Sequence, residues 1–252
     1  MDAGGNPTSS GTVLASAVAL VVVTLALPAR GAAPSGPEPW PAAVSTDTLF
    51  AEARAAVGAL GVYRATVTKT ERVRGTLVGP ETSEVWIRES PRALRMTFLD
   101  AKGRPGRRLV YNEAVRPGQM LVRESGLLGH FSLWVDLDGW LARRASNHSV
   151  RDVGFGPLLD IIDRDRARAR TLGGHVRRDE PPGSGPDGSG CLVFVAPPNA
   201  RTLYATRTRL CFDRALHLPI FVEVFDGQGL LERYRWQHLA PRQTVDDRFF
   251  SP

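Results

Sequence analysis

The chain has 252 residues, of which 42% are hydrophobic and 23% are charged. This composition is typical of a globular protein with one large or two small domains, and it excludes a wholly disordered chain and a polytopic membrane protein. Two cysteines are too few for a disulfide scaffold or a cysteine-rich zinc domain. The net charge is +6, and Lys69 and Lys102 are the only lysines.

The positive charge has two explanations. An arginine-rich composition from a GC-rich genome explains it without function, because acidic residues are interleaved with the basic ones. The alternative is attraction to an anionic partner such as a membrane surface or nucleic acid. The strongest nucleic-acid candidates are Arg207, Arg209, Arg233 and Arg235. Alternation along two half-buried strands explains them as solvent-facing, so we expect no nucleic-acid partner and keep the membrane surface as a candidate.

Residues 13–27 form an uncharged apolar stretch that ends at Pro28 and is followed by small residues. It has the length of a signal-peptide core and is shorter than the ~20 apolar residues of a spanning helix. We therefore predict a signal peptide over residues 1–33, although no Lys or Arg precedes the stretch, and an uncleaved anchor is the alternative. A Pro-rich linker over 34–44 and a single domain over 45–252 follow. Export places the domain in the periplasm or elsewhere in the cell envelope.

Hydrophobic periodicity predicts the first half of the domain as a helix followed by strands. The helix covers Asp47–Leu60, with Ser45 or Thr46 as its cap and Gly61 at its end. Turn residues, including Gly75 and Gly79-Pro80, separate the strands. The strands are Val62–Val73, Glu84–Glu89, Ala93–Asp100, Arg107–Asn112 and Gln119–Glu124.

The second half begins with an apolar cluster among glycines over residues 126–139 and a helix over Phe155–Thr171. The alternating charges of Asp163–Arg170 predict a solvated helix face. More strands follow near His175 and at Cys191–Ala196, Tyr204–Phe212, Pro219–Phe225 and Leu230–Leu239. This order predicts an α+β fold with one curved antiparallel sheet and helices against one face.

Cys191 and Cys211 lie in two of the predicted strands. If these strands form a hairpin, the two residues fall nearly opposite each other, close enough for a bridge. In an oxidising compartment they form a possible disulfide, and two free thiols at packed positions are the alternative. The residues alone leave both open.

No catalytic motif is recognisable. Residues 183–188 match G-x-G-x-x-G, but prolines precede the match and a strand follows it, so we predict a linker. The chain contains no P-loop, H-E-x-x-H or G-x-S-x-G motif, and no two histidines have metal-ligand spacing. His148 with Asp152 is the pair to test for a hydrolase, but no nucleophile accompanies it. We therefore predict a protein without catalytic residues, cofactor or metal site.

The predicted strand Val62–Val73 carries charge on its apolar face. Alternation places Tyr63 and Val67 on one face, and Lys69 and Glu71 continue that same face. Either the strand leaves the core at Lys69, with an ion pair at the rim, or a charged group lies at the mouth of an apolar cavity.

The order of several short motifs resembles a bacterial family catalogued as domain of unknown function 1571. The resemblance covers residues 47–250. The motifs are Tyr63–Arg72, Gly106–Arg108 with Tyr111, Ser125–Gly129, Ser146–His148 with Gly154 and Leu158-Leu159, Cys191–Phe194, Asp213 with Leu218–Ile220, and Glu232 with Tyr234.

This family is similar in fold to the periplasmic lipoprotein carriers LolA and LolB. The resemblance implies an incomplete, half-open β-barrel, with helices over its concave face and an apolar cavity for acyl chains. We therefore expect an exported, monomeric, non-enzymatic carrier whose partner is a lipid or an acylated protein. The alternative is a structural or protein-interaction module of the cell envelope without a ligand cavity.

The residues expected to line the cavity lie on the apolar faces of three predicted strands, and two cations are expected to contact the head group. The lining residues are Tyr63, Val67, Leu94, Met96, Phe98, Leu109 and Tyr111, and the cations are Lys69 and Arg107.

Overall fold

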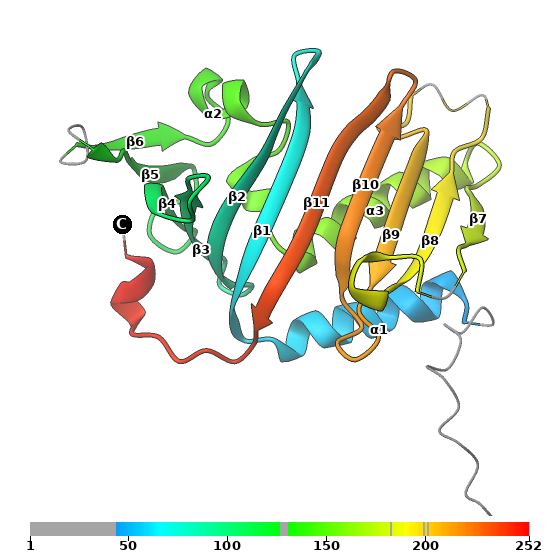
Figure 1. The fold of residues 1–252 in the computed structure, drawn as a ribbon, viewed down its shortest axis with the longest axis horizontal. Helices are drawn as coiled ribbons and strands as arrows, with labels where there is room; N and C mark the ends of the chain where they lie inside the picture. Colours follow the sequence, from blue (N-terminus) through cyan, green and yellow to red (C-terminus); the bar gives the residue numbers. More distant parts are fainter. Residues whose placement is uncertain (1–43, 127–130, 182, 199, 201, 252) are drawn as a thin grey trace, which may run out of the picture. The chain divides into compact units, whose positions relative to one another are not determined.

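A computed structural model describes residues 44–251, except 127–130, 182, 199 and 201. These residues form one antiparallel sheet with helices on one side (Figure 1). The strands are β1 Val62–Val73, β2 Thr76–Arg88, β3 Ala93–Leu99, β4 Pro105–Asn112, β5 Gln119–Arg123, β6 Ser132–Asp136, β7 Val176–Asp179, β8 Gly190–Val195, β9 Arg207–Phe212, β10 Pro219–Asp226 and β11 Gly229–Ala240. The α-helices are α1 Thr46–Ala59, α2 Trp140–Ala145 and α3 Phe155–Arg170, and the 3-10 helices are η2 Val150–Asp152, η3 Pro186–Gly188 and η4 Asp247–Phe250.

The 11-stranded sheet has the order β6-β5-β4-β3-β2-β1-β11-β10-β9-β8-β7. Its edge strands β6 and β7 do not pair with each other, so the sheet is open. Two runs of sequential strands meet where the first strand pairs with the last, and Lys69 of β1 lies opposite Tyr234 of β11. The predicted α+β fold with an incomplete antiparallel barrel is confirmed.

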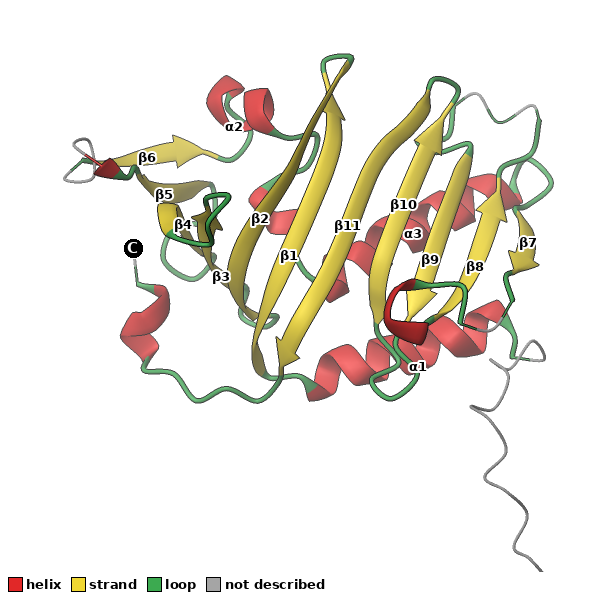
Figure 2. Cartoon of the chain, in the orientation of Figure 1, coloured by secondary structure: helices red, strands yellow, loops and turns green. Residues whose placement is uncertain are grey.

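Helices α1 and α3 cover the β8–β10 part of the sheet (Figure 2). Leu49 and Phe50 of α1 and Leu159 of α3 are buried against Leu192 and Phe212 of the strands. Burying each such side chain contributes about 1.5–3 kcal/mol, so this cluster fixes both helices to the sheet. Of the two predicted caps of α1, Ser45 is the one that accepts a hydrogen bond from the Thr48 backbone nitrogen, at 3.1 Å.

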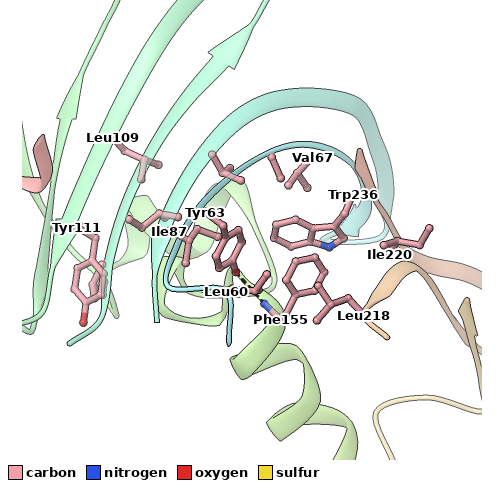
Figure 3. Packing of buried hydrophobic residues seen from close by; sticks show 14 residues of the cluster. Leu60, Tyr63, Val67, Ile87, Leu109, Tyr111, Phe155, Leu218, Ile220 and Trp236 are labelled. Carbon is pink, nitrogen blue, oxygen red and sulfur yellow. Dashed lines mark hydrogen bonds between the residues drawn. The ribbon is translucent and has the colours of Figure 1, made fainter. Parts of the chain in front are cut away.

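A second apolar cluster is centred on Phe155, the first residue of α3 (Figure 3). Its ring stacks on Tyr63 at a centroid distance of 5.6 Å and lies 4.6 Å from Trp236. The Tyr63 hydroxyl donates to Glu89 at 2.6 Å and accepts from the Phe155 backbone nitrogen at 3.3 Å. The start of α3 is therefore held against β1 and β11 by both packing and hydrogen bonds.

The opposite face of the sheet carries paired charges and the C-terminal segment. Arg209 contacts Glu180 at 2.8 Å, and Arg233 contacts Glu223 at 2.7 Å. Over β2, Phe249 of η4 packs on Trp86 at a centroid distance of 4.9 Å. Arg235 lies 3.1 Å from Asp187, so three of the four arginines considered for nucleic-acid contact have carboxylate partners.

The hairpin between β1 and β2 differs from the prediction. Gly79-Pro80 is not a turn but lies within β2, which begins at Thr76. The turn is at Arg74-Gly75, where both residues have positive φ. The added Cβ of any other residue at Gly79 would lie 2.6 Å from the Lys69 carbonyl oxygen, so the bulge in this pair requires glycine.

Cys191 and Cys211 are directly opposite each other on β8 and β9, and a disulfide joins them across a Cα–Cα distance of 4.0 Å. No helix among the described residues has the length and apolar character to cross a membrane. The predicted signal peptide and nearly all of the predicted linker lie outside the described residues.

Candidate functional site

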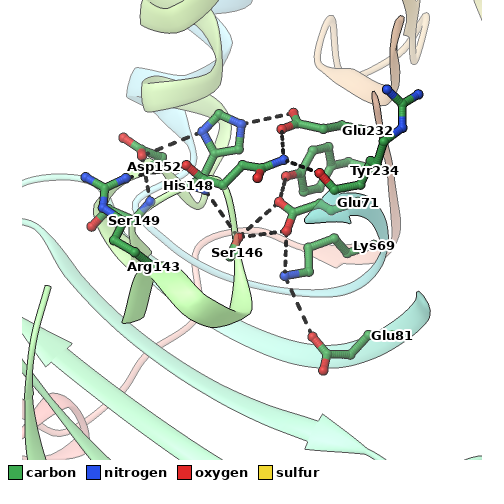
Figure 4. A network of polar contacts seen from close by, with 12 residues as sticks. Lys69, Glu71, Glu81, Arg143, Ser146, His148, Ser149, Asp152, Glu232 and Tyr234 are labelled. Atoms are coloured by element: carbon green, nitrogen blue, oxygen red, sulfur yellow. Dashed lines mark hydrogen bonds and ion pairs between the residues drawn. The ribbon is translucent and has the colours of Figure 1, made fainter. Parts of the chain in front are cut away.

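Two carboxylates face each other inside the sheet. Glu71 of β1 lies directly opposite Glu232 of β11, and each side chain is 2% exposed. Two like charges at such a position destabilise a sheet unless cations and hydrogen-bond donors compensate them. The surrounding residues supply that compensation (Figure 4).

Glu71 accepts hydrogen bonds from two hydroxyls and lies beside an ammonium group. Ser146 Oγ donates to its carboxylate at 2.8 Å, and the Tyr234 hydroxyl donates from the neighbouring strand. Lys69 Nζ lies 3.3 Å from Glu71 Oε2. The ion pair considered from the sequence is thus present, but its carboxylate is buried rather than at a rim.

Glu232 is compensated mainly by the segment that follows α2. His148 Nε2 lies 2.9 Å from Glu232 Oε2, and Asn147 Nδ2 donates to Oε1 at 3.2 Å. The Tyr204 hydroxyl donates to the same carboxylate. Residues 146–148 therefore bring a hydroxyl, an amide and an imidazole to two carboxylates on β1 and β11.

A capping box positions this segment. Ser149 caps the 3-10 helix η2, its side chain accepting from the Arg151 backbone nitrogen, and Asp152 Oδ2 accepts from the Ser149 backbone nitrogen at 2.9 Å. Asp152 also lies 3.8 Å from His148 Nδ1. The imidazole is therefore held between Asp152 on one side and Glu232 on the other.

Burial disfavours the charged form of His148, but hydrogen bonds and charge from Asp152 and Glu232 outweigh it and raise the pKa of His148 to about 10. Burial also favours the neutral forms of Asp152 and Glu232, yet the contacts with His148 hold the pKa of each carboxyl below its ordinary value. The three groups therefore form an imidazolium between two carboxylates at neutral pH.

The two tyrosines remain neutral donors. Burial, followed by the negative charge of Glu232, raises the pKa of Tyr204 and of Tyr234 above the ordinary tyrosine value. Each hydroxyl therefore keeps its proton and donates a hydrogen bond to a carboxylate.

Glu71, His148 and Glu232 also have the composition of a metal site, since each offers one ligand atom and these atoms lie within 4.8 Å of one another. Their atoms are already paired with each other and with neighbouring donors. These three residues and the side chains that contact them are called the polar cluster below. The contacting residues are Lys69, Ser146, Asn147, Asp152, Tyr204 and Tyr234. The carboxylates of the polar cluster already have cationic and hydrogen-bonding partners without a metal ion.

The polar cluster forms where the chain brings distant segments together. Ser146, Asn147, Glu232 and Tyr204 were not predicted as functional residues, and the pairing of His148 with Asp152 was considered only for a hydrolase. One sequence signal did exist, because Glu71, residues 146–148, Glu232 and Tyr234 all lie in motifs that carry the family resemblance.

The residues predicted to line an acyl cavity all lie on the helix-covered face, at different depths. The fully buried ones are Tyr63, Leu94 and Tyr111, with exposures of 1% or less. Val67 and Leu109 are also buried, whereas Met96 and Phe98 on β3 are only half-buried. The apolar face thus becomes more accessible along β3.

Lys69 and Arg107, the two predicted head-group contacts, meet at Glu81. Lys69 Nζ lies 3.8 Å and Arg107 Nη2 lies 3.9 Å from its carboxylate oxygens. The Arg107 guanidinium also lies over the Phe98 ring, 4.3 Å from its centroid. The two cations are therefore brought together next to the half-buried apolar residues.

A separate hollow of about 680 Å³ lies along α3 and is lined mostly by charged residues. Arg54 of α1 bridges Asp160 and Asp163 of α3 there, at 2.8 and 2.7 Å. Asp163, on the predicted solvated face of α3, thus forms an ion pair with α1. The polar lining of the hollow does not suit an acyl chain.

The open antiparallel sheet and the helices against one of its faces define an α+β protein of the half-open barrel type. The chain belongs to the family described as protein of unknown function DUF1571, which matches residues 61–252. No curated protein matches the sequence.

Several solved structures are similar. The lipoprotein LppX of Mycobacterium tuberculosis matches with 14% identity over 80% of this chain and 100% of that chain, with a TM-score of 0.45. A chain of the Pseudomonas aeruginosa MucA/MucB complex matches with 17% identity over 81% and 59%, with a TM-score of 0.44. A LolA superfamily protein of Nitrosomonas europaea matches with 9% identity over 83% and 98%, with a TM-score of 0.36. These low identities do not identify a ligand for this chain.

Proposed function

We propose that this protein is an exported, non-enzymatic carrier of the cell envelope that binds a lipid or the acyl chain of an acylated protein. The observation that carries the proposal is the exposure of the apolar face beyond the helices. Met96 and Phe98 on β3 and Met120 and Val122 on β5 pack against the core and stay half-buried. They offer apolar surface that a ligand can cover.

The energetics of such a site favour an alkyl chain. Each CH₂ group buried against apolar side chains contributes about 0.8 kcal/mol, so ten of them contribute about 8 kcal/mol before the entropic cost of binding. Two of the four side chains are methionines, whose flexible thioethers adapt to chains of different shape. Tyr63, Leu94 and Tyr111 form the floor beneath them rather than the contact surface.

The charges beside this surface favour an anionic head group. Lys69 and Arg107 share one carboxylate, Glu81, and are 25% and 38% exposed. A phosphate or carboxylate that takes the place of the Glu81 side chain between them gains two charge-assisted hydrogen bonds.

The geometry of the polar cluster does not favour acyl-transfer catalysis. Ser146 Oγ donates to Glu71, whereas His148 Nε2 contacts Glu232. The hydroxyl and the imidazole therefore do not form the nucleophile–base pair that acyl-transfer catalysis needs.

A second candidate function is a protein-interaction module with a filled core. It is favoured by Phe155, which occupies the space over Tyr63 and Trp236 that an open barrel would leave for a ligand. The carrier remains the primary proposal because the β3–β5 surface lies beyond this ring.

Two adjacent residues of β5 provide the test. Met120 and Leu121 are both half-buried but point to opposite faces. In a fluorescent fatty-acid titration of the full chain, Met120→Gln should weaken binding about tenfold, and Leu121→Gln should leave it unchanged. Equal effects of the two substitutions, or no saturable binding by the unsubstituted chain, would reject the proposal.

A further inference from the structure

Exposed apolar side chains are concentrated at one end of the molecule. Among the residues that the structure describes, six of ten exposed large apolar side chains lie on β2, on α2 and on or next to β6. Trp140 and Phe131 are the most exposed, at 65% and 71%. The six, called the apolar end below, are Leu77, Val78, Phe131, Leu133, Trp140 and Leu141.

Hydrogen bonds and packing contacts join these three elements. The segment after α2 reaches β1, where Asn147 Nδ2 donates to the Arg72 carbonyl oxygen at 3.2 Å. Arg72 lies directly opposite Leu77 on β2. Helix α2 also contacts β6, and Figure 1 shows α2 between β6 and the β1–β2 hairpin. The apolar end is therefore one region of the molecule rather than scattered side chains.

The apolar end carries arginines that lack carboxylate partners. Arg144 lies over the Trp140 ring at 5.9 Å, and within the described part of the chain neither it nor Arg74 is within 4.0 Å of a carboxylate. Arg143 is 3.2 Å from Asp138, and its charge also acts on Asp152. Tryptophan beside arginine on an exposed surface is the combination that anionic membrane interfaces accept.

The apolar end is continuous with the proposed ligand surface. Leu133 of β6 lies directly opposite Val122 of β5, so the two side chains share a face. An acyl chain leaving a bilayer at Leu133 would reach Val122 and Met120 without crossing a polar surface. A protein partner would not require this continuity.

We propose that the apolar end docks on the surface of an anionic lipid bilayer, with Trp140 and Leu141 at the interface and the arginines against phosphate groups. That the docked apolar end passes a lipid to or from the bilayer rests on the proposed carrier function, but the docking itself does not.

A local probe tests the docking. The full chain with Leu141→Cys, labelled with a polarity-sensitive dye, is mixed with vesicles of phosphatidylglycerol and phosphatidylcholine in equal parts. Val176→Cys is the matched control, because Val176 is a similarly exposed apolar residue on the far edge strand β7. Since the signal is local, attachment through another part of the chain does not mimic it.

We expect a blue shift from the dye at residue 141, none at residue 176, and a smaller shift at 141 with pure phosphatidylcholine or after Arg144→Gln. No shift at 141, or equal shifts at both positions, would overturn the docking proposal and favour a protein partner. Fatty-acid binding without vesicles separates the two proposals. Binding without a shift rejects docking alone, and a shift without binding rejects the carrier alone.

Discussion

Glu71 and Glu232 lie directly opposite each other on β1 and β11, and both are almost completely buried. Their charges are tolerated because His148, Lys69 and a set of neutral donors surround them. Through these contacts the segment after α2 is attached to the junction between the first and last strands.

Replacing one carboxylate should release that segment. Glu232→Gln removes the charge that faces His148 while keeping the shape of the side chain. Breaking a buried ion pair costs about 3 kcal/mol, so the free energy of unfolding should fall by that amount in urea denaturation. Glu113→Gln, at an exposed position, is the control and should change stability by less than about 0.5 kcal/mol. Equal stability of the two variants would contradict a structural role for the cluster.

Because the pKa of His148 is raised in the folded protein, the stability of the protein should fall as the pH becomes alkaline. Its ordinary value is 6.5 and its folded value is about 10. A group with a raised folded pKa stabilises fully below its unfolded pKa and loses that contribution as pH rises through the folded pKa. The free energy of unfolding should therefore fall by a few kcal/mol between pH 6.5 and 10.

The measurement compares urea denaturation across this pH range for the unsubstituted chain, His148→Gln and His238→Gln. His148→Gln should remove most of the decrease, and His238→Gln, at an exposed histidine, should keep it. A decrease that survives His148→Gln would assign the pH dependence to other groups.

Arg107 offers the cleaner test of head-group binding. Lys69→Glu is also expected to weaken binding of an anionic lipid, but it places a third carboxylate beside Glu71 and Glu81. Arg107→Glu should lower the affinity about tenfold without unfolding the chain. Arg108→Glu changes the charge equally on the opposite face and should have little effect. Unchanged affinity in both Lys69→Glu and Arg107→Glu would remove these residues from the site.

The bridge between β8 and β9 should matter for stability. It closes a segment with a sequence separation of 20 residues, for which loop-closure entropy gives about 3 kcal/mol. The Cys191→Ser and Cys211→Ser double variant should lose about that much free energy of unfolding. Thiol titration of the unfolded, unreduced chain provides the direct check, since two titratable thiols would show that the native protein lacks the bridge.

Local patterns predicted much of the fold. The strand Val62–Val73 has the predicted bounds, because its alternation is long and its ends are marked by glycine and by a turn. Helix α3 begins at the predicted residue, Phe155, directly after Gly154. Helix α2 was missed because six residues are too few for a helical period to be recognised.

The polar cluster was harder to predict, because it depends on contacts between distant residues. Glu71 meets Glu232 only when the first strand pairs with the last, and no local pattern determines that pairing. Asp152 is the neighbour of His148 in sequence, but the closer partner of His148 is Glu232, whose Oε2 lies 2.9 Å from Nε2. Burial of Glu71 was suggested by its place on the apolar face of β1, but the donors that make this burial tolerable come from other segments.

The carrier proposal is tested most directly by native mass spectrometry of the mature protein purified from a bacterial periplasm, followed by lipid extraction. We expect a stoichiometric lipid or fatty acid that co-purifies, and less of it with Met120→Gln than with Leu121→Gln. A ligand-free mass that is unchanged after addition of fatty acid or phospholipid would contradict the carrier function and favour a protein-interaction module.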